Sequence, residues 1–100
     1  MRVINQKTLQ DFWESYPDPE GPLREWFKTA LAADWENIRD VRGIYPHVDS
    51  IETPWSGTLT VFNIRGNKYR MITRIRYDWK LINIRCFLTH AQYDKETWKE

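Results

Sequence analysis

The spacing of apolar residues changes once along this chain, and that change constrains the fold more than any other feature. Leu9, Phe12 and Trp13 begin a stripe at helical spacing, and a second helical stripe runs over residues 23–31. After residue 47 the period falls from about 3.6 residues to two, the period of a strand. Two amphipathic helices followed by alternating strands predict an α+β domain, because the helices need a sheet to cover their apolar faces.

Three segments are predicted as strands because they are rich in β-formers and alternate in polarity, at residues 58–64, 68–78 and 80–90. Residues 65–67, Arg-Gly-Asn, predict a hairpin turn between the first two. We therefore expect a small antiparallel sheet backed by two N-terminal helices, in the order β-α-α-β-β-β-α, as a single domain over 1–100. The remaining expected elements are a short strand at 1–4, a short helical turn after Asp34 and a terminal helix or turn at 91–99.

Composition narrows the class of protein. No apolar run approaches the roughly 18–20 residues of a membrane span, and the N-terminal residues lack the apolar core of a signal peptide. Cys86 is the only cysteine, and no cysteine–histidine cluster has the spacing of a zinc site. The sequence therefore indicates a cytoplasmic domain with no membrane partner, no metal and no other cofactor.

The near-neutral net charge of +1 hides an uneven distribution. Residues 1–63 hold six basic and ten acidic residues, a net of −4, whereas residues 64–100 hold nine basic and four acidic, a net of +5. Residues 64–86 contain seven cationic side chains and a single acidic one, Asp78. Such asymmetry indicates a nucleic-acid partner for the basic half.

Alternation gathers the positive charge on one face of the predicted sheet. In the strand at 68–78, the side chains on one face are mostly apolar and suit a core, whereas those on the other face are mostly cationic. If the apolar residues of the next strand also face the helices, an arginine and a phenylalanine of that strand join the cationic face. Arginine forks bind phosphate, and an aromatic ring can stack on a base of single-stranded RNA. The members of this predicted surface are Lys68, Arg70, Arg74, Arg76, Arg85 and Phe87.

The same face is open to other interpretations. It fits a non-catalytic RNA- or ribosome-binding module, a protein that only receives an acidic partner, and a solvated strand face with no partner. His47 stands in a loop before the sheet and is interpreted as structural or solvent-exposed.

Three short motifs occur in order at matching spacing in the C-terminal half: Phe62-Asn63-Ile64, Gly66-Asn67-Lys68-Tyr69-Arg70 and Thr89-His90-x-x-Tyr93-Asp94. Together with the opening stretch MRVINQKTLQDFWESYP, they resemble the HigB branch of the RelE-like toxins of bacterial toxin–antitoxin modules. The resemblance spans nearly the whole chain. It implies the same expected fold, a small antiparallel sheet backed by two N-terminal helices.

The resemblance also implies an activity and partners. Members of the family are small endoribonucleases that cleave mRNA, usually in the ribosomal A site, and so stop translation and growth. A cognate antitoxin, in this branch usually a helix-turn-helix protein, binds and neutralises the toxin. The pair represses its own operon, so that operator DNA is reached only through the antitoxin.

Metal-free RNA cleavage uses the 2′-OH as nucleophile, and it needs a base, an acid and cations for the transition state. Histidine titrates near neutral pH and suits proton transfer. Lysine and arginine suit the phosphate, and tyrosine can orient substrate or stack on a base. On residue type we predict Arg70, His90, Lys68 and Tyr93 as catalytic. We predict that Asn67, Arg74, Arg76, Arg85 and Phe87 bind RNA.

Overall fold

The computed structural model describes residues 1–16, 18–96 and 98, and it confirms the α+β class. A short strand and two helices are followed by a third, shorter helix, a run of four strands and a terminal helix. The elements are β1 (Arg2–Ile4), α1 (Gln6–Ser15), α2 (Glu20–Ala32), α3 (Ile38–Ile44), β2 (Asp49–Thr53), β3 (Gly57–Ile64), β4 (Tyr69–Arg76), β5 (Leu81–Thr89) and α4 (His90–Asp94).

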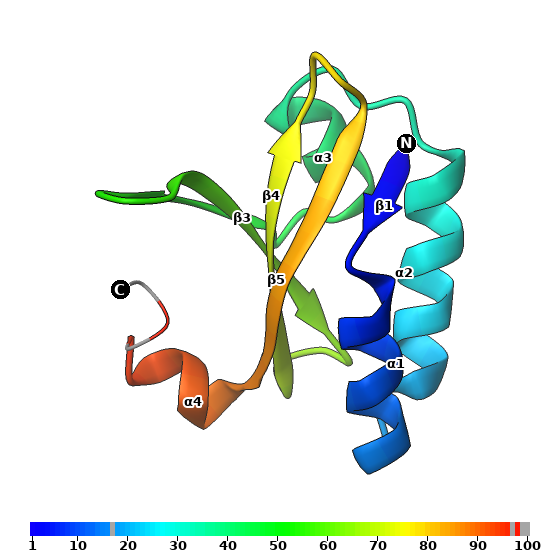
Figure 1. Ribbon diagram of the computed structural model, residues 1–100, viewed down its shortest axis with the longest axis vertical. Coiled ribbons are helices and arrows are strands. Elements are labelled where there is room, and N and C mark those ends of the chain that lie inside the picture. Colours follow the sequence, from blue (N-terminus) through cyan, green and yellow to red (C-terminus); the bar gives the residue numbers. More distant parts are fainter. Residues whose placement is uncertain (17, 97, 99–100) are drawn as a thin grey trace.

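The sheet has the strand order β1-β5-β4-β3-β2. Strands β3, β4 and β5 pair antiparallel, as predicted. Strand β2 pairs antiparallel with β3, and β1 adds a parallel edge beside β5. Strand β2 is an addition to the prediction. Its sequence, DSIET, contains one strongly apolar residue and therefore gives little alternation signal. It pairs with β3 from Asp49 opposite Val61 to Thr53 opposite Gly57, and the resulting hairpin extends away from the centre of the sheet (Figure 1).

The main core lies between the sheet and the helices (Figure 1). Trp26 of α2 and Phe62 of β3 are both almost fully buried and meet edge to face, with ring centroids 5.4 Å apart. Trp35 also stacks on Phe62, with ring centroids 6.3 Å apart. Trp26 and Trp35 are therefore both core residues. No helix among the described residues is long and apolar enough to cross a bilayer.

The last two helices are held by side-chain caps. Asn37 accepts hydrogen bonds from the first backbone N–H groups of α3. Asp34, the residue expected to start this helix, instead pairs with Lys80 at 2.9 Å, and this hydrogen bond lowers the pKa of the Asp34 carboxyl. Thr89 and Gln92 form a reciprocal capping box at the start of α4. The short terminal helix is thus positioned directly at the end of β5.

A bulge in β5 reverses the predicted assignment of its faces. Ile84 pairs with Thr73 and Cys86 pairs with Ile72, so Arg85 is an extra residue between them. Beyond the bulge, Phe87 turns toward the helices and Cys86 turns toward the opposite face. The prediction that Phe87 lies on the cationic face is therefore wrong. Its ring is 6% exposed and packs against aromatic rings of α1 and β4.

The position of Phe87 predicts an effect on stability and none on RNA binding. Phe87→Leu should lower the free energy of unfolding by about 1–2 kcal/mol, because a buried ring loses contacts. Urea unfolding measures this loss, and fluorescence anisotropy with a short single-stranded RNA measures binding. A drop in RNA affinity of the folded variant would show that the ring does reach a base.

Candidate functional site

A hollow lies between the β2–β3 hairpin and α4. Figure 1 shows both elements on the side of the sheet that points away from α1 and α2. Two of the residues that line the hollow, Leu59 and Ile72, belong to a small buried cluster with Val61. The hollow has a volume of about 470 Å³, and we call it the α4 groove. Its walls are formed by Ser56, Leu59, Ile72, Arg85, Cys86, Leu88, Gln92, Lys95 and Trp98.

The Arg70 side chain lies on this same face, held by the β3–β4 turn. Its position in β4 is opposite Asn63 of β3 and Leu88 of β5. One terminal nitrogen, Nη1, donates to the backbone oxygens of Asn67 and Tyr69, at 3.3 and 3.1 Å. The other, Nη2, donates to Oδ1 of Asn67 at 3.0 Å. Asn67, predicted to bind RNA, therefore positions the guanidinium.

These hydrogen bonds leave one edge of the Arg70 guanidinium for a ligand. Arginine carries five N–H donors, and the three bonds above use both protons of Nη1 and one of Nη2. Within the described residues, Nε–H makes no hydrogen bond and Nη2 makes one. In a guanidinium, Nε–H and one Nη2 proton point along the same edge. Two parallel donors of this kind match two oxygens of one phosphate.

Arg70 is also a buried charge without a counter-charge. Its residue is 8% exposed, and no carboxylate pairs with it within the described part of the chain. A buried cation is costly unless an anion or hydrogen bonds compensate it. Carbonyl oxygens supply part of that compensation here. An anionic ligand would supply the rest, in a low-dielectric setting that strengthens the attraction.

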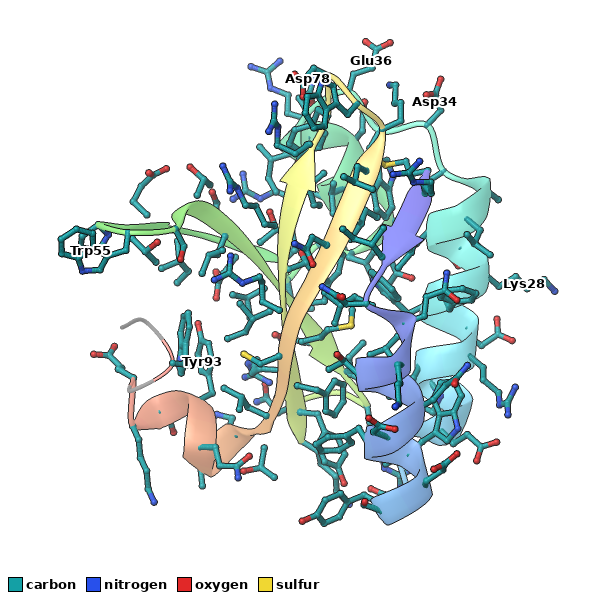
Figure 2. All side chains as sticks on the ribbon, in the orientation of Figure 1. Lys28, Asp34, Glu36, Trp55, Asp78 and Tyr93 are labelled. Atoms are coloured by element: carbon teal, nitrogen blue, oxygen red, sulfur yellow. The ribbon has the colours of Figure 1, made fainter. Side chains whose placement is uncertain are left out.

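Tyr93 brings α4 over Arg70. Figure 2 shows its side chain projecting from α4 toward the β2–β3 hairpin. The Arg70 guanidinium carbon lies 5.6 Å from the centre of the Tyr93 ring, a cation–π contact. The Tyr93 ring also stacks on Trp98, with ring centroids 5.0 Å apart. The structure therefore joins Arg70, Asn67 and Tyr93 in one contact group.

His90 stands at the start of α4, three residues before Tyr93. Its backbone N–H donates to the carbonyl of Lys68 at 2.9 Å, which ties α4 to the β3–β4 turn. Its ring Nδ1 lies 2.9 Å from a carboxylate oxygen of Asp94. A carboxylate that accepts from Nδ1–H holds the ring in the tautomer whose lone pair is on Nε2.

The other predicted cations divide into paired and unpaired groups. Lys68 lies 3.7 Å from Asp18 in the α1–α2 loop, so its ammonium is drawn to the helical side. Arg76 pairs with Asp78 at 3.3 Å and covers the ring of Trp79. Among these predicted cations, two exposed arginines have no carboxylate partner within the residues that the structure describes. They are Arg74 and Arg85, both on the hollowed side of the sheet.

Several contributors to this site were not predicted. Asp94 was given no role in the predicted site, although the i,i+4 spacing of His90 and Asp94 on a helix is a usable signal for their contact. Ser56 accepts a hydrogen bond from Arg85 at 3.2 Å and so ties the hairpin to β5. Trp55, at the tip of that hairpin, is 87% exposed (Figure 2). No signal in the sequence distinguishes it from the core tryptophans.

Two further observations, on Cys86 and on possible metal ligands, bear on the chemistry of the site. Burial raises the pKa of the Cys86 thiol, so Cys86 is a poor nucleophile near neutral pH. No group of three or more histidine, cysteine, aspartate or glutamate side chains is placed to hold a metal ion among the described residues.

The fold and this site define a small α+β protein whose sheet presents arginines, a histidine–aspartate pair and aromatic rings on one hollowed face. Residues 19–96 match the family of HigB toxins, described as the RelE-like toxic component of a toxin–antitoxin system. The chain belongs to this family, and the resemblance inferred from its motifs is confirmed.

Similar proteins carry related names. The chain is 27% identical over 94 residues to the mRNA interferase toxin HigB of Escherichia coli (strain K12), covering 94% of this chain and 88% of that protein. It is equally similar, with the same coverage, to the mRNA interferase HigB of Escherichia coli O157:H7 and of Shigella flexneri.

Proposed function

We propose that this protein is the toxin of a type II toxin–antitoxin module and an endoribonuclease that cleaves mRNA on the ribosome, stopping translation and growth. The observation that carries the proposal is Arg70, a buried guanidinium with a two-donor edge left for phosphate and no carboxylate partner within the described residues. The names of the similar proteins support the choice of mRNA as substrate.

In the proposed reaction, the 2′-oxygen of one nucleotide forms a bond to the adjacent phosphorus and the bond from phosphorus to the 5′-oxygen breaks. The products are a 2′,3′-cyclic phosphate and a 5′-hydroxyl. His90 takes the proton of the 2′-OH at Nε2, and Asp94 stabilises the imidazolium that forms. Arg70 binds the charge that grows on the phosphoryl oxygens.

Two further residues complete the proposed catalytic set. Lys68 donates a proton to the leaving 5′-oxygen; its pairing with exposed Asp18 is a surface contact that costs little to open. Tyr93 orients the substrate beside Arg70 through its ring and its hydroxyl. No resident metal takes part in this scheme.

The proposal extends to partners and place. A helix-turn-helix antitoxin would neutralise the toxin, and operator DNA would be bound only through that antitoxin. The reaction takes place in the cytoplasm, where the substrate is.

Expression in cells tests the proposed function. Induction should arrest growth, and primer extension on an abundant transcript should show new cleavage sites within its coding region. If growth arrest occurs without cut mRNA, the protein is instead a non-catalytic RNA- or ribosome-binding module. If neither arrest nor cleavage occurs, the toxin proposal is wrong.

The two unpaired arginines should give the protein its salt-dependent affinity for RNA. Arg74→Ala and Arg85→Ala are each expected to reduce the slope of log K against log salt by about 0.7, the value for one phosphate contact on a single strand. Lys28→Ala removes the same charge from α2, on the far side of the molecule, and should leave the slope unchanged (Figure 2). Equal slopes for all these variants would show that RNA does not cross this face.

A further inference from the structure

A second hollow lies beside the β3–β4 turn that holds Arg70. It has a volume of about 520 Å³ and lies between the segment that follows α3 and the β3–β4 turn. We call it the loop pocket. Its apolar lining comes from Ile44, Tyr45, Pro46 and Val48, and its polar lining comes from His47, Asn63, Gly66 and Asn67.

We propose that the loop pocket binds one base of the RNA substrate and thereby sets the base preference of cleavage. This inference rests on the proposed function, because it concerns a nucleotide whose phosphate lies at Arg70. A mostly apolar hollow with a few convergent polar groups is the usual form of a small-molecule site.

The position of the pocket supports this assignment. Asn67 belongs to both sites: its carbonyl and Oδ1 hold the Arg70 guanidinium, and the same residue lines the loop pocket. Asn63 lies directly opposite Arg70 in the β3–β4 register, so its side chain shares the face of Arg70. A phosphate at Arg70 therefore places an unstacked neighbouring base beside these two asparagines.

The chemistry of the lining also suits a nucleobase. The Tyr45 ring is held by edge contacts to Trp35 and Phe62, with ring centroids 6.4 and 5.3 Å away. It therefore forms part of a rigid wall, with Pro46 beside it. Because Oδ1 of Asn67 accepts from Arg70, the Asn67 amide is left as a donor to a base carbonyl or ring nitrogen.

His47 and Asn63 are the residues best placed to discriminate among bases. The exposed imidazole of His47 and the half-buried amide of Asn63 both line the pocket, and neither is part of the proposed catalytic set. Each can offer a donor or an acceptor to a base edge, which is how single-stranded RNA is read.

The test uses four mRNAs that differ only in the base next to the cleaved bond, each presented to the protein both as free RNA and on programmed ribosomes. Asn63→Ala and His47→Ala should each reduce the rate ratio between the best and worst base about 5- to 10-fold, the effect of one lost hydrogen bond. Both should still cleave. Gln10→Ala, an amide removed from α1 on the helical layer, should keep the wild-type ratios, and thermal melting checks that all variants are folded.

The outcomes separate the two proposals. If the wild-type protein cleaves none of the RNAs, the proposed function fails, and the pocket assignment with it. If the wild-type protein cleaves and both pocket variants keep its ratios, the pocket assignment alone is overturned. Unchanged ratios combined with lost inhibition by the antitoxin would assign the pocket to a protein partner instead.

Discussion

Arg70→Lys is expected to slow RNA cleavage by on the order of 10²–10³-fold while the protein stays folded. Lysine keeps the positive charge but is a point charge on a flexible stem, without the planar fork. It cannot bind the oxygens of Asn67 on one edge and offer two parallel donors to phosphate on the other. Single-turnover cleavage of a short RNA, or of mRNA on programmed ribosomes, measures the rate.

The matched control is Arg24→Lys, which makes the same chemical change on α2. Arg24 pairs with Glu20 at 2.9 Å on the helical layer, and its replacement should leave cleavage unchanged. If Arg70→Lys cleaves as fast as the control, then the two-donor edge of Arg70 plays no part in the transition state.

His90→Ala is expected to lose about 10²- to 10⁴-fold in cleavage rate, the usual contribution of a positioned acid–base group. The variant removes the ring that contacts Asp94 but keeps the backbone N–H that ties α4 to Lys68. The loss should therefore be chemical rather than structural. The measurement is the same single-turnover assay, with circular dichroism to confirm the fold.

Added imidazole distinguishes proton transfer from a structural role. It should restore part of the His90→Ala rate, because a free base can enter the vacated space beside α4. A structural histidine would show no such recovery. A His90→Ala protein that cleaves at the wild-type rate would remove His90 from the mechanism, and the base would have to be sought elsewhere on the hollowed face.

The alternation of side chains along β4 predicted the centre of the site, because β4 is regular around Arg70. From Tyr69 to Ile72 the residues alternate between the helical core and the hollowed face, so Arg70 was placed correctly. The alternation failed in β5 because Arg85 is an extra residue, and no local pattern marks a bulge. That one insertion moved Phe87 into the core and Cys86 out of it.

The alternation of side chains along a strand also gives no information about residues outside the strands. Lys68 precedes the first residue of β4, and its direction follows the charge of Asp18 rather than the pleat. The role of Asn67 as the holder of Arg70 depends on the shape of the turn, and composition could only mark it as a turn residue. The contact of His90 with Asp94 could be predicted from the i,i+4 spacing of a helix that starts at His90.

Within the described residues, fewer cations are left without an acidic partner than the charge count of the sequence suggests. Several of the cations between residues 64 and 86 are matched by acidic residues of other segments, as Lys80 is by Asp34. Arg70, Arg74 and Arg85 are left without a carboxylate within the described residues. The net charge of the basic half therefore overstates the size of the interface, and the unpaired arginines define where it lies.

The chemical nature of the new RNA ends tests the central claim most directly. The wild-type protein should produce a 5′-hydroxyl, which polynucleotide kinase labels without prior phosphatase treatment, together with a 2′,3′-cyclic phosphate. Arg70→Lys and His90→Ala should produce few or none of these ends. A 5′-phosphate at the cut, or full cleavage by both variants, would contradict attack by the 2′-oxygen at the site built around Arg70 and His90.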